Sequence, residues 1–405
     1  MRVLLITKIF PSSLEPLSAP FNRQQMFELS RRCDVQVLAA IPHVPLAWAL
    51  SIPKRAAKLV ALPARERVHG LDVTYLRQLY VPRVGLASAV PLYLASLLPH
   101  RDRLRAADVL LATWAYPDGC ASVLAALACG KPVVVKVHGS DVNVVLKTRA
   151  ARSIASRILP LADAIVAVSR PLAGQIVHLG VPPDRVHFVE NGVDGSMFYP
   201  RDRDAARRKL DVPSDARVIL FVGRLEPQKG IDELLRAFSR VREGAPDALL
   251  VLIGSGVSCD RVRAIAARDP SGAIRVVGAR PHDEIAEWMG ACDVLTLPSW
   301  AEGTPNVILE ALASGRPVVA TRVGGIPDIL SDQRSGIVVS ARDANALAQA
   351  LASAIESGRE GKWDPAAVRA CGPWSWKESA GALEHVLRRA ARAGARVPVP
   401  EVLFS

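Results

Sequence analysis

Two glutamates, Glu302 and Glu310, stand eight positions apart in the stretch of sequence best suited to hold a ligand. A Gly-Thr-Pro-Asn loop at 303–306 lies between them, and Val307 is expected to begin a helix with Glu310 in its first turn. Free N–H groups at a helix N-terminus bind phosphate or sugar hydroxyls, and a carboxylate beside them can accept two hydrogen bonds from a ribose diol. Taken singly, each glutamate has a plainer interpretation, because Glu310 could complement the helix dipole and Glu302 could be a surface carboxylate.

A second stretch combines cations with glycines, in the order Gly223-Arg224…Lys229-Gly230. It follows the apolar run 218–222, which we expect to be a buried strand, and it precedes a helical pattern. Ligands bind at the carboxyl ends of the strands in open α/β sheets. Arg224 offers a planar fork of donors and Lys229 a mobile point charge, a pair suited to a diphosphate. Alone, the same pattern is also typical of a solvated turn.

A histidine in the first half of the chain follows another apolar run, in the sequence His138-Gly139-Ser140-Asp141. A lone histidine is often a structural residue, but the carboxyl end of a strand favours a role in a site. The turn after the first strand has a different composition, since no glycine occurs before Gly70. A dinucleotide site needs glycines at that turn, which argues against an NAD- or FAD-dependent oxidoreductase.

The elements that would position these residues alternate along the whole chain. Strands are predicted at 3–6, 35–39, 133–137, 164–168, 218–222, 249–253, 294–297 and 318–320, and helices at 23–32, 119–129, 231–242 and 307–314. Runs that are apolar throughout suit parallel strands covered on both faces, so we predict an α/β fold. A chain of 405 residues is too long for one core. We expect domains at 1–195 and 217–371, a linker at 196–216, and a final helix with a tail at 372–405.

The composition indicates a soluble globular protein of the cytoplasm, with 50% hydrophobic and 22% charged residues. The chain starts without the pattern of a signal peptide, and its longest later apolar run, 84–98, is broken by Pro91 and too short to span a bilayer. The six cysteines lack the spacing of a zinc site and are interpreted as reduced thiols.

One sequence resembles a metal site, namely Asp202-Arg203-Asp204, which has the D-x-D pattern that binds a divalent ion in other sugar-transferring enzymes. It stands among arginines, just before a predicted helix. Carboxylates at a helix start complement the dipole, and this is the interpretation we adopt. We therefore expect no metal.

The net charge of +12 is concentrated in the first half of the chain. Residues 1–195 hold 23 Lys and Arg against 13 Asp and Glu, whereas residues 196–371 hold 23 of each. Such an excess suggests an acidic partner, and the aromatic content of 5% argues against nucleic acid. The stretches 46–59 and 84–105 join apolar to basic residues, as in segments that rest on anionic lipid. Core helices with solvated basic ends would have the same composition.

Together these stretches resemble glycosyltransferase family 4. Besides the E-x7-E element, the cationic loop and the His138 turn, the match includes 191–194 (Asn-Gly-Val-Asp), 314–321 (Ser-Gly-Arg-Pro-Val-Val-Ala-Thr) and 324–328 (Gly-Gly-Ile-Pro-Asp). These motifs keep the family's order and spacing, the resemblance covers nearly the whole chain, and it is strongest from Asn191 to Ala341. It implies the GT-B fold, in which two Rossmann-like, doubly wound domains face each other across a cleft. The last helix then crosses back to the first domain.

The resemblance also implies roles for individual residues. Arg224 and Lys229 would grip the donor diphosphate, Glu302 would hold the donor sugar, and His138 would face that sugar near the reacting carbon. These four form the expected catalytic set. The expected donor-binding set is Asp141, Gly223, Gly254, Arg280, Gly303, Thr304, Pro305, Asn306, Val307 and Glu310, with Glu310 on the ribose and Arg280 near the base. The chain departs from the family in lacking the common Gly-Gly pair after the first strand, where it has only Ser12, Ser13 and the segment 18–21.

The function expected from this resemblance is retaining, metal-independent hexosyl transfer from a nucleoside-diphosphate sugar to a hydroxyl acceptor, with no cofactor. The stretch 114–119 is similar to bacterial members that build cell-surface polysaccharides, which suggests a glycan or lipid-linked glycan as acceptor and a place on the inner face of the plasma membrane. Two alternatives remain open at this point. One is an epimerase or hydrolase of nucleotide sugars with the same fold, and the other is an inactive membrane-associated scaffold.

Overall fold

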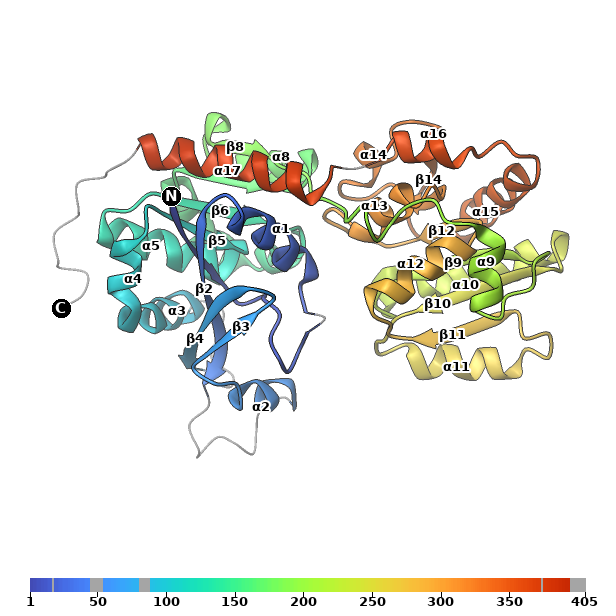
Figure 1. Cartoon of the computed structure of the whole chain (residues 1–405), viewed down its shortest axis with the longest axis horizontal. Coiled ribbons are helices and arrows are strands. Elements are labelled where there is room, and N and C mark those ends of the chain that lie inside the picture. The colour runs from blue at the N-terminus through green and yellow to red at the C-terminus, as the bar shows by residue number, and fades with distance from the viewer. Residues whose placement is uncertain (17, 44–53, 80–87, 373, 394–405) are drawn as a thin grey trace. The chain divides into compact units, whose positions relative to one another are not determined.

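The chain forms two compact units in a computed structural model that describes residues 1–16, 18–43, 54–79, 88–372 and 374–393 (Figure 1). Unit 1 comprises Met1–Asn191 together with Trp376–Ser405, and unit 2 comprises Gly192–Ser375. The chain therefore passes from unit 1 to unit 2 after Asn191 and returns at Trp376. The expected α/β architecture is confirmed in both units.

Unit 1 is built on an eight-stranded sheet in the order β3-β4-β2-β1-β5-β6-β7-β8, parallel except for β3 against β4. The strands are β1 (Arg2–Thr7), β2 (Asp34–His43), β3 (Arg65–Val68), β4 (Leu71–Leu79), β5 (Val109–Thr113), β6 (Val133–Val137), β7 (Ala164–Ala167) and β8 (Val186–Phe188). Its helices are α1 (Pro20–Ser30), α2 (Lys54–Val60), α3 (Ala89–Leu97), α4 (Arg101–Ala106), α5 (Cys120–Cys129), α6 (Ser140–Asn143), α7 (Arg149–Ile158), α8 (Arg170–Val177) and α17 (Trp376–Ala393).

The side chains of each central strand alternate between two covered faces, as the apolar runs predict. Leu4 and Ile6 of β1 lie in one hydrophobic core with Tyr93 of α3 and Val123 of α5. The long helix α17 lies along unit 1, where it packs on α1 and against β5, β6 and β7 (Figure 1). The last helix of the chain thus completes the first unit.

Unit 2 has a six-stranded, wholly parallel sheet in the order β11-β10-β9-β12-β13-β14. Its strands are β9 (Arg217–Val222), β10 (Ala248–Ile253), β11 (Ile274–Gly278), β12 (Val294–Leu297), β13 (Val318–Thr321) and β14 (Gly336–Val339). Its helices are α9 (Arg203–Lys209), α10 (Ile231–Gly244), α11 (Cys259–Arg268), α12 (His282–Ala291), α13 (Asn306–Ala313), α14 (Ile326–Ile329), α15 (Ala344–Arg359) and α16 (Pro365–Ala370).

The stretch 196–216, expected to be a linker, is part of unit 2. Its helix α9 packs against α12, and the side chain of Arg207 is buried there. Arg207 Nη2 lies 2.8 Å from Asp293 Oδ2, and its Nε donates to the carbonyl of Ala291 at 3.0 Å. The charged composition that suggested a linker therefore reflects a buried arginine with its partners and a solvated outer face.

The two apolar-basic stretches are only partly described, since residues 44–53 and 80–87 lie outside the described part of the chain. Within the second stretch, Val90, Tyr93 and Leu97 of α3 are buried in the core of unit 1. The apolar residues of this helix therefore serve the core. Among the described residues, no helix combines the length and the apolar character needed to cross a membrane.

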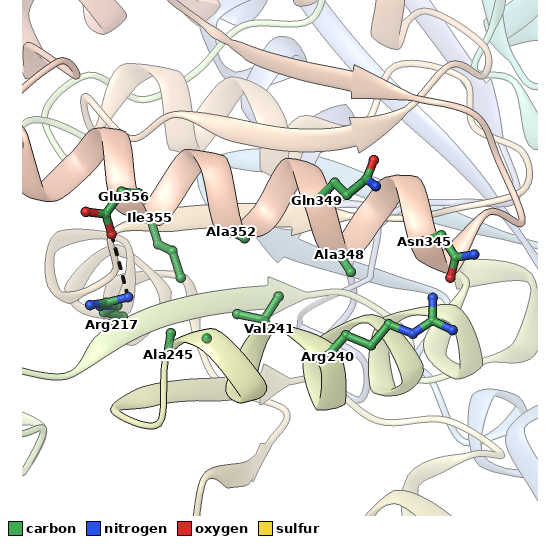
Figure 2. A pocket seen from close by; sticks show the side chains of 11 residues that line it. Arg217, Arg240, Val241, Ala245, Asn345, Ala348, Gln349, Ala352, Ile355 and Glu356 are labelled. Carbon is green, nitrogen blue, oxygen red and sulfur yellow. Dashed lines mark ion pairs between the residues drawn. The ribbon is translucent and has the colours of Figure 1, made fainter.

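A groove of about 540 Å³ runs between α10 and α15 of unit 2 (Figure 2). Small residues such as Gly244, Ala348 and Ala352 line it, and Arg217 Nη1 lies 3.7 Å from Glu356 Oε2 at one end. None of the residues expected to bind a donor lines this groove. The groove is a consequence of packing two helices through small side chains.

Candidate functional site

The order of the strands in unit 2 leaves an opening beside β9. The chain proceeds from β9 to β10 on one side, while β12 pairs with β9 on the other side. When the loops after two adjacent strands run in opposite directions, a crevice forms between them at the carboxyl edge of the sheet. Ligands bind in such a crevice. The loops at this position are 223–230 and 298–305, which carry half of the fourteen site residues expected from the sequence.

These two loops are in direct backbone contact. The N–H of Trp300 donates to the carbonyl of Gln228 at 2.9 Å. Gly230 has φ 71°, and a Cβ on it would lie 2.0 Å from the carbonyl oxygen of Pro298. Only glycine permits both this backbone conformation and this approach. The cationic loop is thereby held against the loop of Glu302.

The expected donor glycines Gly223 and Gly254 also meet at this edge of the sheet. Gly223 donates to the carbonyl of Ile253 at 2.9 Å, and Gly254 donates to the carbonyl of Gly278 at 2.9 Å. Gly254 has φ 144°, and a Cβ there would lie 1.8 Å from the oxygen of Gly223. The chain segments that follow β9, β10 and β11 therefore come together at backbone distance, which glycine at 254 permits.

Lys229 and Glu302, expected to be catalytic, form an ion pair across the two loops. Lys229 Nζ lies 2.5 Å from Glu302 Oε1, with side chains that are 18% and 10% exposed. The buried Ser299 donates its hydroxyl to the same oxygen at 2.6 Å. The ammonium is thus fixed at the carboxyl ends of β9 and β12 by a carboxylate that is itself held in place.

The side chain of Arg224 is 65% exposed and lies 2.8 Å, Nη1 to Oε1, from Glu226. The second oxygen of Glu226 accepts from Gln228 Nε2 at 2.6 Å. An exposed pair of this kind contributes little to stability, so Arg224 can exchange Glu226 for a diphosphate at small cost. Sequence reasoning missed Glu226 and Gln228, although both lie inside the cationic loop it had singled out.

Helix α13 begins at Asn306, one residue earlier than expected, because Pro305 at the preceding position has the extended backbone (φ −76°, ψ 110°) of a helix N-cap. Glu310 therefore stands in the second turn, and the expectation of the first turn was wrong. Its side chain is only 12% exposed, and Oε1 lies 3.7 Å from Nε2 of His282. Burial raises the pKa of Glu310 to about 7. The loop segment 303–305 and the residues Asn306 and Val307 lie between the two glutamates, as the motif predicts.

Arg280 and His282 belong to the segment that follows β11. Arg280 is partly exposed, and its Nε lies 3.4 Å from Glu284 Oε2. His282, the first residue of α12, faces Glu310, and its ring meets that of Phe198 edge-on at 6.0 Å. Sequence reasoning missed His282, and its only signal was its position two residues after Arg280.

The structure assigns His138 and Asp141 to unit 1, whereas the other expected site residues are in unit 2. The buried carboxylate of Asp141 accepts from the backbone N–H groups of Ala115, at 2.9 Å, and of Gly139, at 2.7 Å. It also accepts from the N–H of His138 at 3.1 Å. Asp141 therefore fixes the turn that presents His138 at the carboxyl end of β6.

The environment of His138 keeps its imidazole neutral near neutral pH. Its ring lies 4.8 Å from that of Phe21 and is stacked at 6.5 Å with that of Trp114. Burial lowers the pKa of His138 well below its ordinary value, and the charge of Lys136 lowers it further. A neutral imidazole can accept or donate a hydrogen bond but cannot act as a cation.

The turn after β1, where the family's Gly-Gly pair is missing, carries Lys8. Lys8 Nζ lies 3.6 Å from Oδ2 of the buried Asp118, and the backbone N–H of Lys8 donates to Oδ1 at 2.7 Å. The hydroxyl of Tyr93 donates to the same oxygen at 3.1 Å. A side-chain cation thus stands directly after β1, held by a buried carboxylate. Neither Lys8 nor Asp118 was singled out from the sequence.

The D-x-D sequence has a structural role at its first residue. Asp202 is the N-cap of α9, and its Oδ1 accepts from the N–H of Ala205 at 2.8 Å. Asp204 lies 3.7 Å from Arg203. Within the described ranges, no three His, Cys, Asp or Glu side chains are grouped as they would be around a metal ion.

Comparison with known proteins connects this geometry to one family. Residues 28–196 match the model described as Glycosyltransferase Family 4, and residues 216–357 match that described as Glycosyl transferases group 1. The chain is 30% identical to the putative teichuronic acid biosynthesis glycosyltransferase TuaC of Bacillus subtilis, over 87% of this chain and 88% of that protein. It is also 30% identical to a D-inositol 3-phosphate glycosyltransferase of a Nocardioides species, over 90% and 84% of the two chains.

Solved structures share the fold over almost the whole chain. Anabaena HepE in complex with UDP superposes with a TM-score of 0.72 at 19% identity, over 96% of this chain and all of that one. Sucrose-phosphate synthase of Thermosynechococcus elongatus gives 0.70 at 20% identity, over 97% of each chain. This likeness confirms the expected GT-B class of fold. Because TuaC is 30% identical over 87% of this chain and the Glycosyltransferase Family 4 model matches residues 28–196, the chain belongs to glycosyltransferase family 4.

Proposed function

We propose that the protein is a retaining glycosyltransferase that moves a hexosyl group from a nucleoside-diphosphate sugar to a hydroxyl of a glycan or lipid-linked glycan. The observation that carries the proposal is the Lys229–Glu302 pair, which joins the loop after β9, where Arg224 also lies, to the loop after β12. Relatives support the choice of substrates, since HepE was solved with UDP and TuaC is named for teichuronic acid biosynthesis.

In the proposed reaction the bond between the anomeric carbon and the donor diphosphate breaks, and negative charge develops on the departing phosphate. Lys229 and Arg224 stabilise that charge. The acceptor hydroxyl forms the new glycosidic bond on the same face of the sugar and gives its proton to the leaving phosphate oxygen. The anomeric configuration is then retained, and no carboxylate nucleophile or cofactor is required.

The first test is a thermal-shift comparison of UDP, GDP and ADP, followed by their sugar conjugates. A ligand present at about one hundred times its Kd stabilises the folded state by about 2.7 kcal/mol, so the preferred nucleotide should be plain in the melting curve. The preferred donor is then incubated with and without candidate glycan acceptors. Sugar released or epimerised at the same rate without an acceptor would favour the hydrolase or epimerase. A protein that binds none of these nucleotides would be the scaffold.

Nucleotide affinity should rise with pH across the titration of Glu310. The carboxylate accepts two hydrogen bonds from the ribose diol, whereas its protonated form accepts fewer. Because the pKa of Glu310 is raised to about 7, lowering the pH from about 8 to about 6 protonates it and weakens binding by up to about tenfold per pH unit. Calorimetry measures the pH dependence of the nucleotide Kd for the wild type and for Glu310→Gln. Protonation of the nucleotide affects both proteins equally, so the difference between the two pH profiles reports on Glu310. Equal pH profiles would contradict the assignment.

We propose that the transfer needs no metal, because Lys229, Arg224 and backbone N–H groups neutralise the donor diphosphate. Activity should therefore survive EDTA, and Asp202→Asn with Asp204→Asn should leave kcat unchanged. Asparagine caps a helix about as well as aspartate does, so little change in stability is expected from the substitution at Asp202. Activity that is lost on chelation and restored by magnesium or manganese would reverse this conclusion.

We propose further that unit 1 rests on the anionic inner face of the plasma membrane. The proposal draws on the charge excess in residues 1–195 and on exposed cations such as Lys58, Arg101 and Arg105. Flotation with vesicles of neutral and of acidic lipid should show binding to the acidic vesicles alone, lost at high salt. Equal flotation with both lipids would leave these cations a role in solvation only.

A further inference from the structure

A lysine lies fully buried inside unit 1. Lys136 stands on β6, is 0% exposed, and donates from Nζ to Gln25 Oε1 at 2.5 Å and to Asn191 Oδ1 at 3.2 Å. Neither partner is charged, and the described residues offer Lys136 no ion pair. Burial lowers its pKa to about 7. Lysine is almost never fully buried unless it is paired, because desolvating an ammonium is costly, so this position calls for a specific role.

The partners of Lys136 extend into a chain of hydrogen bonds. Gln25, on α1, donates from Nε2 to the hydroxyl of Ser379 on α17 at 2.8 Å. That hydroxyl donates in turn to the carbonyl of Glu190. We call Gln25, Lys136, Glu190, Asn191 and Ser379 the crossover clamp. All five belong to unit 1.

The clamp lies at the two places where the chain changes unit. Glu190 and Asn191 are the last residues before the chain enters unit 2, and Ser379 lies three residues beyond Trp376, where it returns. Lys136 is thus linked to the outgoing segment directly, through Asn191, and to the returning segment through Gln25 and Ser379. The Ser379 hydroxyl reaches the same two elements from the returning segment, since it accepts from Gln25 on α1 and donates to the carbonyl of Glu190.

The same two segments are also joined on the side of unit 2. The N–H of Val193 donates to the carbonyl of Trp374 at 2.9 Å, and Val193 pairs with Ser375 as a parallel bridge. The outgoing and returning segments therefore run together, fixed by backbone in unit 2 and by the clamp in unit 1. Removal of the clamp would leave the unit 1 ends of both segments without their shared anchor.

We propose that Lys136 is a positioning residue that fixes both connecting segments on unit 1, so that the chain leaves and re-enters this unit in one defined direction. The family resemblance implies that His138 of unit 1 acts on a donor held by unit 2, and such a reaction requires this definition. This link to catalysis rests on the function proposed above, whereas the clamp itself does not. The competing interpretation is a core residue whose loss destabilises unit 1 as a whole.

Hydrogen exchange on the ligand-free protein separates these interpretations. In Lys136→Met the side chain keeps its length but loses its donors, and we expect backbone amides in 188–194 and 374–382 to exchange at least about tenfold faster than in the wild type. Amides of β1 and β10 should be unchanged. The matched control is Val135→Ala, which removes buried volume from the next residue of β6 without touching the clamp. In this control, amide exchange in 188–194 and 374–382 should not be accelerated more than in the rest of unit 1.

A second variant keeps the test valid if Lys136→Met does not fold. Ser379→Ala removes the hydroxyl that joins Gln25 to the carbonyl of Glu190, and it should accelerate exchange in the same two segments. Acceleration spread evenly over unit 1, or no change in either segment, would overturn the proposal for both variants.

Steady-state kinetics distinguishes a positioning residue from a purely structural one, because replacing a purely structural residue would not change kcat. Lys136→Met should lower kcat at least about tenfold relative to Val135→Ala, while the Kd of the nucleotide selected by thermal shift stays unchanged, because the donor groups belong to unit 2. A kcat equal to that of the control would refute the positioning role. If the wild type bound no nucleotide, the proposed function would fail, but the exchange experiment would still decide whether the clamp exists.

Discussion

Replacement of Lys229 by alanine is expected to lower kcat by about 10²–10³-fold, with a smaller rise in the KM of the donor. Negative charge develops on the departing diphosphate as the glycosidic bond breaks, so a preorganised cation stabilises the transition state more than the bound substrate. Glu302 and Ser299 hold that cation in place before the donor arrives, since Lys229 Nζ lies 2.5 Å from Glu302 Oε1.

Steady-state kinetics on the purified variant tests this expectation. Arg240→Ala is the control, because Arg240 is a cation of the same unit that lines the groove of Figure 2, apart from the expected site. Arg224→Lys should lose activity despite keeping its charge, because a point charge cannot reproduce a bidentate fork. If kcat of Lys229→Ala holds and only KM rises, the pair merely binds the donor and leaving-group stabilisation is not its role.

Glu310→Gln is expected to raise the Kd of the nucleotide about ten- to hundredfold, because a hydrogen bond to a charged group contributes about 1.5–3 kcal/mol. The same change should raise the melting temperature of the free protein at about pH 8. The folded-state pKa of Glu310 is raised to about 7 from 4.5, so folding favours its protonated form. Stability from this group is therefore present at low pH and is lost as the pH rises from 4.5 through 7.

Calorimetry with a melting curve checks both parts of this expectation, with Glu356→Gln as the control for loss of a carboxylate in the same unit. Weaker binding combined with higher stability identifies a residue kept for function at a cost to the fold. An unchanged Kd would remove Glu310 from the site.

The sequence predicts the parallel strands at the centre of each sheet better than those at its edges. Strands such as β9 and β10 are apolar throughout because helices cover both faces, and this pattern is visible without a structure. β8, β11 and β14 were not predicted, since they are short and half-buried. β5 was also missed, although it is central, wholly buried and apolar except for its last residue. The antiparallel pair β3 and β4 was missed because its alternation is weak.

The residues of the site were found where they belong to a local motif, and missed where tertiary contacts create the relationship. The E-x7-E element and the cationic loop are contiguous in sequence, so their types and spacing indicate chemistry directly. The proximity of Lys229 to Glu302, and of His282 to Glu310, depends on which strands are neighbours. Sequence spacing does not contain that information. The members of the crossover clamp come from four separate parts of the chain, so sequence spacing could not bring them together either.

The place of α17 in unit 1 determines an order of events during synthesis. Unit 2 is one uninterrupted segment, Gly192–Ser375, and can fold as soon as it leaves the ribosome. Unit 1, although its first 191 residues emerge earlier, must wait for Trp376–Ala393 before α1 and the adjoining face of its sheet are covered. A nascent chain halted before Trp376 would carry a finished second unit and a first unit with an open apolar face. The half of the protein that is translated first is therefore the half that is completed last.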